Sequence, residues 1–273
     1  MKITPNKLYS NYLVVYFDVL GWKDLTLNSP LACSFVSNRI NGLRYKLKSR
    51  SIFSREKVIS FFFSDSVILT LELPMDNENN LEKQKIIFYQ IAELQSELFE
   101  NWGVLLRGFI TIGECFIDPF EHVCFGPAIN KSVLKEKLIC FPKIVLDKDH
   151  FPDKLMVNNS RQNSVQINRK DSWWNKKAHR GECYEEFKEI QESFFLDYIK
   201  VQKNSLDRYV GGFNQVNNFR TSFRSKLNKQ ITNDVTMQNE KLSLKYIWLT
   251  KYYDKCFRKN SFHLDYKNFT KSN

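Results

Sequence analysis

The sequence predicts an α+β fold, in which helices pack on a mostly antiparallel sheet. Apolar β-favouring runs alternate with amphipathic helical segments in the order strand, helix, hairpin, helix, strand, and further helices follow at the C-terminal end. The 273 residues, 42% of them hydrophobic, are enough for a substantial core. No internal repeat of the kind that builds solenoids is present.

The first strand is expected at residues 11–20, where the run YLVVYFDVL ends at Gly21. An acidic residue, Asp18, lies inside this otherwise apolar run. A helix is expected over 30–48, because an Asn-Ser-Pro start signal at 28–30 precedes apolar residues at helical spacing. The chain therefore begins with a strand followed by a helix.

The next segments complete a predicted core over residues 11–147. The run 57–73 is interrupted by Phe63-Ser64-Asp65-Ser66, which favours a hairpin. An amphipathic helix over 81–103 should end at Gly103. The remaining predicted elements are a strand over 104–117, a short strand after Val123, a helix from about Pro127 and a strand over 142–147.

The C-terminal part is predicted to belong to the same domain, which extends over residues 1–257. Residues 151–185, rich in Asn, Lys and Ser, indicate a loop or insertion. A strand is expected at 194–200, followed by helices at about 206–230 and 235–257 and a loosely held tail at 258–273.

Composition excludes several classes of protein. No apolar run approaches the roughly 18 residues of a membrane span, and the N-terminus lacks a secretory signal, so we expect a cytoplasmic protein with no membrane contact. The six cysteines form no CxxC pair and the four histidines no HxxxH spacing, which argues against zinc and disulfide frameworks. A net charge of +11 suits a polyanion, either a nucleic acid or a nucleotide phosphate, and the basic stretch around 220–229 is typical of a solvated helix face.

Two aspartates are the candidate metal ligands. Asp18 lies in a buried strand and Asp65 at the tip of the next hairpin, so adjacent strands would bring their carboxylates together. Two such carboxylates repel and favour a cation such as Mg²⁺ or Mn²⁺, and the carbonyl of Val19 offers a further oxygen. The alternative is that Asp18 pairs with a lysine and Asp65 completes a turn.

Four stretches in the same order resemble the motifs of class III adenylyl and guanylyl cyclases: YFDVLGW (16–22), SDS (64–66), LLRGFITIGE (105–114) and FGPAINKSVLKEK (125–137). The sequence is most similar to the pyrimidine cyclases of bacterial Pycsar anti-phage systems, which ICFPKIVLD (139–147) and LKYIWLTKYYDK (244–255) also resemble. The resemblance implies the cyclase fold, with a ferredoxin-like core, and extends from about residue 11 to 256.

The resemblance also implies a chemistry. Asp18 and Asp65 would be the metal aspartates for two Mn²⁺ or Mg²⁺ ions, with the backbone oxygen of Val19 as a further ligand. Phe17 and the turn up to Gly21 would lie along the triphosphate. In such enzymes the ribose 3′-hydroxyl attacks the α-phosphate and pyrophosphate leaves, in sites that two protomers of a homodimer share.

Departures from the family pattern concern the base and the transition state. Phe61 occupies the position at which purine cyclases carry a base-reading lysine or glutamate, which favours a pyrimidine; the alternative is a core ring. The transition-state asparagine corresponds to Asn130, but the arginine position is Leu134, so Lys135 or Arg107 is expected to supply the cation. Two structural alternatives remain open, a sheet-edge ion pair for Arg107 and a solvated helix face for Lys135 with Lys131 and Lys137.

Three functions follow from these observations. The first is a lyase that converts UTP, or CTP as the second choice, into cUMP or cCMP for anti-phage signalling, with an effector that responds to the product and not to direct contact. The second is a catalytically silent nucleotide-binding module, which Leu134 favours. The two retained aspartates disfavour this silent module. The third is a nucleic-acid-binding protein, which the net charge and the basic region around 220–229 favour.

Overall fold

The computed structural model describes residues 9–20, 22, 26–27, 30–48, 58–73, 80–151, 167–168, 194–207, 212–232 and 240–257. Most of the segment predicted as a loop or insertion, and the whole of the predicted tail, lie outside these residues. None of the described helices is long and apolar enough to cross a membrane.

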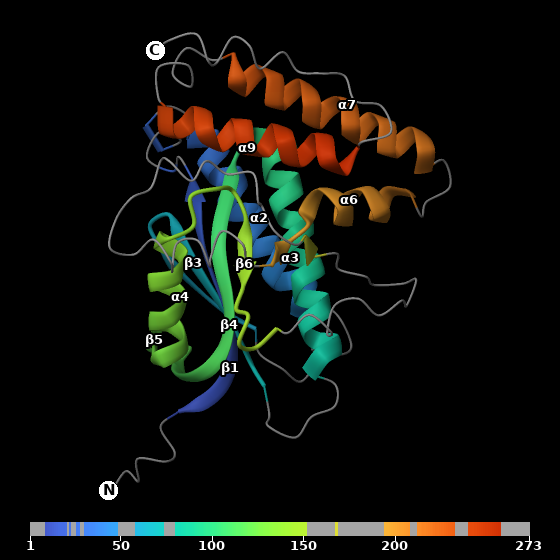
Figure 1. The fold of residues 1–273 in the computed structure, drawn as a ribbon. Helices are drawn as coiled ribbons and strands as arrows, with labels where there is room; N and C mark the ends of the chain where they lie inside the picture. The colour runs from blue at the N-terminus through green and yellow to red at the C-terminus, as the bar shows by residue number, and fades with distance from the viewer. Residues whose placement is uncertain are drawn as a thin grey trace, which may run out of the picture.

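The N-terminal half of the described chain forms a ferredoxin-like core (Figure 1). Its strands are adjacent in the order β2-β3-β1-β4, and all three of these pairings are antiparallel. The elements in chain order are β1 (Ser10–Leu20), α2 (Pro30–Lys48), β2 (Ile59–Phe63), β3 (Ser66–Glu72), α3 (Asn80–Trp102) and β4 (Leu105–Asp118). The predicted α+β class is confirmed.

Four short strands extend this sheet on the β4 side. The strand β6 (Ile144–Leu146) pairs with β4 in parallel, and β8 (Phe195–Leu196) and β7 (Ile167–Asn168) continue antiparallel beyond it. The strand β5 (Val123–Phe125) pairs with the end of β4 and leads into helix α4 (Pro127–Lys137). Because β4 lies between β1 and β6, it is an interior strand of the sheet.

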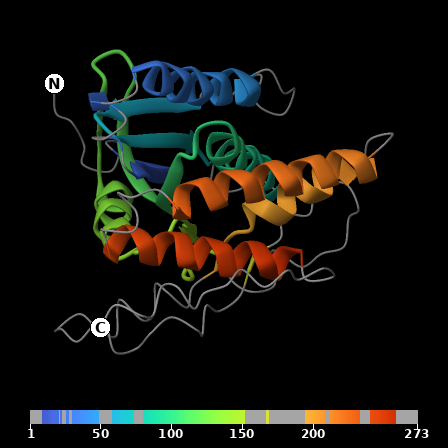
Figure 2. The ribbon, with the colours of Figure 1, turned by 90° about the horizontal axis from the view of Figure 1, so that it is seen from above.

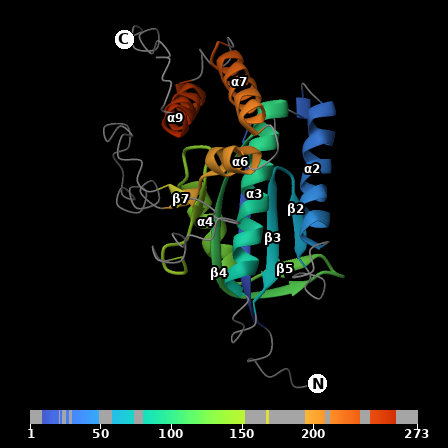
Figure 3. The same cartoon turned by 90° about the vertical axis from the view of Figure 1, so that its right-hand side faces the viewer.

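The two faces of the sheet bear different helices, as Figure 3 shows: α2 and α3 lie on one side and α4 on the other. Alternate residues of β1 contribute to each side. Leu13, Val15 and Phe17 belong to the large core that includes α2 and α3. Val14 instead packs in a smaller cluster with Ile129 of α4. Asp18 is four residues after Val14 and so points to the same side of the strand, which is the α4 face.

Three C-terminal helices form a group at the end of the sheet where β1 ends (Figures 1 and 2). They are α6 (Tyr198–Asp207), α7 (Gly212–Ile231) and α9 (Glu240–Cys256), and α3 lies between them and α2. Aromatic rings join the group: Phe223 of α7 stacks on Tyr253 of α9 with centroids 5.4 Å apart, and Trp248 stacks on Phe141 at 5.7 Å. This packing attaches α9 to the edge of the core.

The predicted boundaries hold through the core but fail after it. The strand expected over 194–200 is only Phe195–Leu196, because α6 begins at Tyr198. The Asp197 carboxylate accepts a hydrogen bond from the Lys200 amide at 3.3 Å and so caps the helix. The next helix starts at Gly212 and not near residue 206, and β7 is a strand within the predicted loop.

Gly108 is a position at which the fold excludes a side chain. A Cβ there would lie 2.4 Å from the Tyr16 carbonyl oxygen and 2.7 Å from the Phe17 Cβ. We expect Gly108→Ala to lower the free energy of unfolding by about 1–3 kcal/mol, because β1 and β4 must move apart. Gly42→Ala, in helix α2 with nothing within 4 Å of the added Cβ, should instead stabilise by up to about 1 kcal/mol. Urea unfolding of both variants tests this, and equal effects would contradict it.

Candidate active site

The candidate site is built around the end of β1. The antiparallel register places Asp18 directly opposite Arg107 on β4 and opposite Ser66 on β3. Directly paired residues of neighbouring strands present their side chains on the same face. Three side chains from three strands therefore converge on the α4 face.

The β2–β3 turn brings the second aspartate to this point. Ser64 adopts a φ of 58°, in the left-handed region, within the two-residue turn Ser64-Asp65. The Val19 amide donates a hydrogen bond to the Asp65 carbonyl oxygen at 2.9 Å, which fixes the turn against β1. The Tyr16 hydroxyl donates to the Ser66 Oγ at 2.9 Å. The predicted juxtaposition of the two aspartates is thus present.

Arg107 connects the site to helix α4. Its Nη2 lies 3.2 Å from the Asp18 Oδ2, its Nε forms an ion pair with the Glu136 Oε1, and its Nη1 donates to the Ile139 carbonyl at 3.4 Å. The Arg107 side chain is 26% exposed, whereas that of Glu136 is only 5% exposed. The ion pair that was one interpretation of Arg107 exists, but it lies within the sheet and not at its edge.

Burial raises the pKa values of two carboxyl groups here. Burial raises the pKa of Asp18, Arg107 opposes this, and the charge of Asp65 together with a shared hydrogen bond adds to it. Burial likewise raises the pKa of Glu136 to about 7, although the Arg107 guanidinium lowers it and the charge of Asp18 raises it further. The site holds more negative charge than its single guanidinium balances.

This arrangement fits a divalent cation held in an open site. Burial is the main cause of the raised pKa of Asp18, and the Asp65 charge adds to it, so a cation bound to both carboxylates would relieve their repulsion. Within the described residues, no group of three or more His, Cys, Asp or Glu side chains is placed to enclose a metal. A cation bound to Asp18 and Asp65 would therefore need further oxygens, from the backbone at Val19, from water or from a substrate.

A pocket of about 310 Å³ opens beside Asp65, between α2 and the β2–β3 hairpin. Its walls are mostly apolar, with Trp22 and Phe62 among them, and Ser37 and Asn41 of α2 add polar groups. Val19 also lines the pocket. The pocket thus borders the second aspartate from the α2 side, whereas Asp18 and Arg107 lie on the α4 face.

Two aromatic residues predicted to bind substrate are buried. Phe17 is 0% exposed within the core under α2 and α3, so its backbone and not its ring faces the site. Phe61 is 4% exposed and packs with Val14 and Ile129. Within a single chain, Phe61 is therefore a core residue, which was one of its two interpretations. Its contact with a substrate base stays a prediction.

Helix α4 presents the predicted transition-state residues outward. Asn130 is exposed, Leu134 is 64% exposed, and Lys135 is partly buried. Ser132 and Glu136, on the opposite side of the helix, are buried. Asn130 and Leu134 are therefore separated from the Asp18 cluster by the helix, whereas Lys135 lies at its flank, and the part of all three in binding or catalysis stays a prediction.

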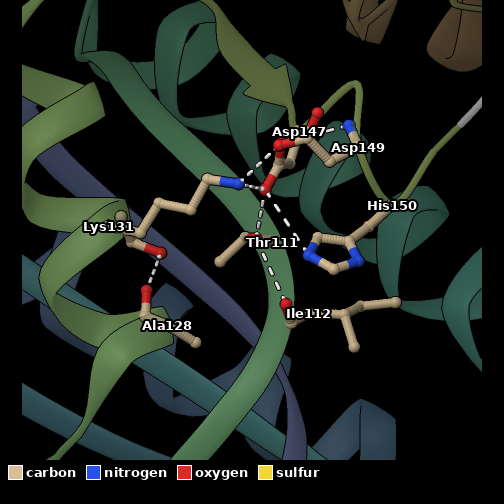
Figure 4. A network of polar contacts seen from close by, with 8 residues as sticks. Thr111, Ile112, Ala128, Lys131, Asp147, Asp149 and His150 are labelled. Atoms are coloured by element: carbon tan, nitrogen blue, oxygen red, sulfur yellow. Dashed lines mark hydrogen bonds and ion pairs between the residues drawn. The ribbon is translucent and has the colours of Figure 1, made fainter.

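A second polar network holds α4 to the sheet (Figure 4). The buried Asp147 carboxylate, 3% exposed, accepts a hydrogen bond from Thr111 of β4 and lies 2.6 Å from the Lys131 Nζ. Asp149 lies 2.9 Å from the same Nζ, and His150 lies 3.9 Å from Asp147. Lys131 is therefore an anchor of α4 and not part of a solvated face.

Sequence reasoning missed Glu136 and Asp147. A signal for Glu136 was present, because Ala128, Ser132 and Glu136 recur at a spacing of four, which puts them on one face of a helix. An acidic residue on that inward face needs a partner. For Asp147, which ends an apolar strand, no comparable signal exists.

Comparisons with known proteins were made by sequence and by structure. No family model matches the sequence, and no curated protein matches it. The fold is similar to the guanylyl cyclase domain of the RhoGC fusion protein from the aquatic fungus Blastocladiella emersonii, at 14% identity and a TM-score of 0.38 over 51% of this chain and 82% of that one.

Two further solved structures are also similar. The catalytic core of a rhodopsin-guanylyl cyclase with converted specificity, in complex with ATPalphaS, has 12% identity and a TM-score of 0.42 over 69% of this chain and 96% of that one. A bacterial light-regulated adenylyl cyclase has 12% identity and a TM-score of 0.42 over 81% of this chain and 60% of that one. These similarities are too distant to assign a family, so we base the function on the residues of this chain.

The raised pKa of Glu136 predicts a pH-dependent stability. Its folded pKa of about 7 lies above the ordinary 4.5, so the folded protein binds this proton more tightly than the unfolded chain. The stabilisation from the proton is complete below about pH 4.5 and is lost as the pH rises to about 7. Relative to Glu136→Gln, the wild-type free energy of unfolding should fall by up to about 3 kcal/mol across this range.

Urea unfolding of both proteins at several pH values measures this difference. The exposed Glu114, near the other end of β4, provides the control variant Glu114→Gln, whose difference from wild type should not follow this profile. A difference between wild type and Glu136→Gln that stays constant across the range would contradict the assignment.

Proposed function

We propose that this protein is a nucleotidyl cyclase that converts UTP, or CTP as the second choice, into the 3′,5′-cyclic nucleotide and pyrophosphate. The contact between the Asp18 and Asp65 carboxyl groups at the end of the central strand, beside Arg107, carries the proposal. The order of the four cyclase-like motifs supports it, because their residues Asp18, Asp65 and Arg107 converge in one place.

Asp18 and Asp65, with the backbone oxygen of Val19, would hold two Mn²⁺ or Mg²⁺ ions. When bound, such ions lower the pKa of the ribose 3′-hydroxyl and neutralise phosphate charge. The contact of the buried Asp18 carboxyl group with that of Asp65 supports this requirement for cations.

The residues of the chain position the substrate. The pocket beside Asp65 offers an apolar wall and the polar groups of Ser37 and Asn41 to one part of the nucleotide. Arg107, still 26% exposed, presents its guanidinium toward phosphate oxygens. In the reaction the 3′-oxygen forms a bond to the α-phosphorus, the bond to the bridging oxygen of pyrophosphate breaks, and the hydroxyl proton is released.

The exposure of Asn130 and Leu134 on the outer face of α4 supports a homodimer with shared sites. These residues point away from the Asp18 cluster of their own chain, so a second protomer is the natural recipient. Apolar side chains on β5, Val123 at 40% and Phe125 at 41% exposure, lie close to the start of this helix. An exposed apolar surface of this kind favours association.

The apolar residue at the predicted base-reading position supports a pyrimidine substrate. Phe61 offers no hydrogen bond to a purine edge, and it is buried in the cluster beneath α4. We further infer a cytoplasmic role in anti-phage signalling, in which an effector binds the cyclic product. A silent nucleotide-binding module is the second candidate, because Leu134 occupies the arginine position.

The reaction is tested by incubating the protein with UTP, CTP, ATP or GTP and Mn²⁺ and identifying the products by mass. One cyclic pyrimidine nucleotide is expected, and Asp18→Asn and Asp65→Asn should each reduce its formation by at least about a thousandfold. Asp207→Asn, which removes an exposed carboxylate on α6, is the matched control. Nucleotide binding without any product would support the silent module instead.

The cation that replaces the missing arginine is tested on α4. Lys135→Met should lower kcat by about a hundredfold with little change in KM, because a transition-state charge contact is lost. Lys137→Met removes an exposed charge two residues away and should leave kcat within about twofold. Equal effects of the two variants would show that Lys135 has no specific role.

A further inference from the structure

We propose that Glu136 is a positioning residue that holds Arg107 where its guanidinium competes with a divalent cation for Asp18. This inference rests on the proposed function, because the cation and a substrate triphosphate are the partners involved. The proposal assigns two positions to Arg107, one on Asp18 and one on a phosphate, with Glu136 as the fixed point between them.

Each nitrogen of the Arg107 guanidinium contacts a different oxygen. The inner nitrogen, Nε, pairs with Glu136, whereas the two outer nitrogens reach the Ile139 carbonyl and the Asp18 carboxylate. The outer contacts, at 3.4 and 3.2 Å, are long for charged hydrogen bonds. The guanidinium is thus anchored at its inner nitrogen by α4, and its contact with the metal aspartate is the weaker one.

Burial explains why Glu136 retains its partner. Its side chain is 5% exposed, so loss of Arg107 would leave a carboxylate that neither water nor another close cation compensates fully. Lys137 adds a positive charge from an exposed position, where solvent screens it. Arg107 therefore stays on Glu136 whatever happens at Asp18, and only its outer nitrogens are exchangeable.

The charges near Asp18 explain why an exchange is favourable. Two carboxylates, those of Asp18 and Glu136, contact the guanidinium, and Asp65 lies beside Asp18, so the formal charge of the four groups is −2 when all are ionised. A divalent cation balances this charge, and Asp18 then no longer needs Arg107. The outer nitrogens, once free of Asp18, can donate to the triphosphate that accompanies the cation. The inner nitrogen stays on Glu136 during this movement.

This arrangement predicts opposite effects on two affinities, which an ion pair with a purely structural role does not produce. Arg107→Gln removes the competitor, so Mn²⁺ alone should bind about tenfold more tightly. The same variant loses the phosphate contact, so KM for the Mn²⁺–nucleotide complex should rise about tenfold. Mn²⁺ binding is measured without nucleotide by electron paramagnetic resonance at about pH 8, where Glu136 is ionised.

A double-mutant cycle tests Glu136 directly. Glu136→Gln should weaken Mn²⁺ binding about fivefold, because Asp18 becomes the only carboxylate left to Arg107. In the Arg107→Gln background the same change should alter Mn²⁺ affinity less than about twofold. Equal weakening in both backgrounds would mean that Glu136 attracts the cation directly, and this would overturn the proposal.

Two further variants complete the design. Glu114→Gln removes an exposed carboxylate near the other end of β4 and should leave Mn²⁺ affinity unchanged. If Arg107→Gln does not fold, Arg107→Lys replaces it, because one ammonium group cannot bridge both carboxylates as the planar guanidinium does. In that background Glu136→Gln should again have little effect, and a full fivefold weakening would overturn the proposal.

The outcomes separate this inference from the proposed function. Product formation and Mn²⁺ binding without the predicted cycle would overturn the role of Glu136 and leave the cyclase intact. Absence of both product and Mn²⁺ binding, in wild type and in Arg107→Gln, would overturn the two together.

Discussion

The antiparallel register of β1 is the constraint on which the rest of the site depends. It sets Asp18 opposite Arg107 on one neighbour and opposite the end of the β2–β3 turn on the other. A shift of one residue in either pairing would turn the carboxylate to the opposite face, into the apolar core under α2 and α3. The absence of a side chain at Gly108 allows the close approach of β4 that this register needs.

Two ionic contacts tie helix α4 to the sheet, in addition to the apolar packing of Ile129. Lys131 pairs with the buried Asp147 at the end of β6, and Glu136 pairs with Arg107 on β4. The outer face of the same helix exposes Asn130 and Leu134. A molecule that binds this face would contact the same helix that carries Glu136, the ion-pair partner of Arg107.

The sequence predicts the core of the fold well because its strands and helices have distinct periods. The Asp18–Asp65 pair was also predictable, since an acidic residue inside an apolar strand and another at the tip of the next hairpin are conspicuous. The environment of Arg107 was not, because its partners lie 89 residues back and 29 residues ahead in the sequence. The start of α6 was missed because Phe194 to Ile199 reads as one apolar run, in which Asp197 acts as a helix cap.

The electrostatics of the site work against the stability of the fold. Asp18 and Glu136 both have pKa values raised by burial, so each is less stable ionised in the folded chain than in water. The apolar clusters on both faces of β1, with Val14 on one side and Phe17 on the other, must offset this penalty. A cation that binds Asp18 and Asp65 would remove part of the repulsion. The resulting gain in stability belongs to the cation-bound state alone, which makes the free energy of unfolding a direct measure of cation binding.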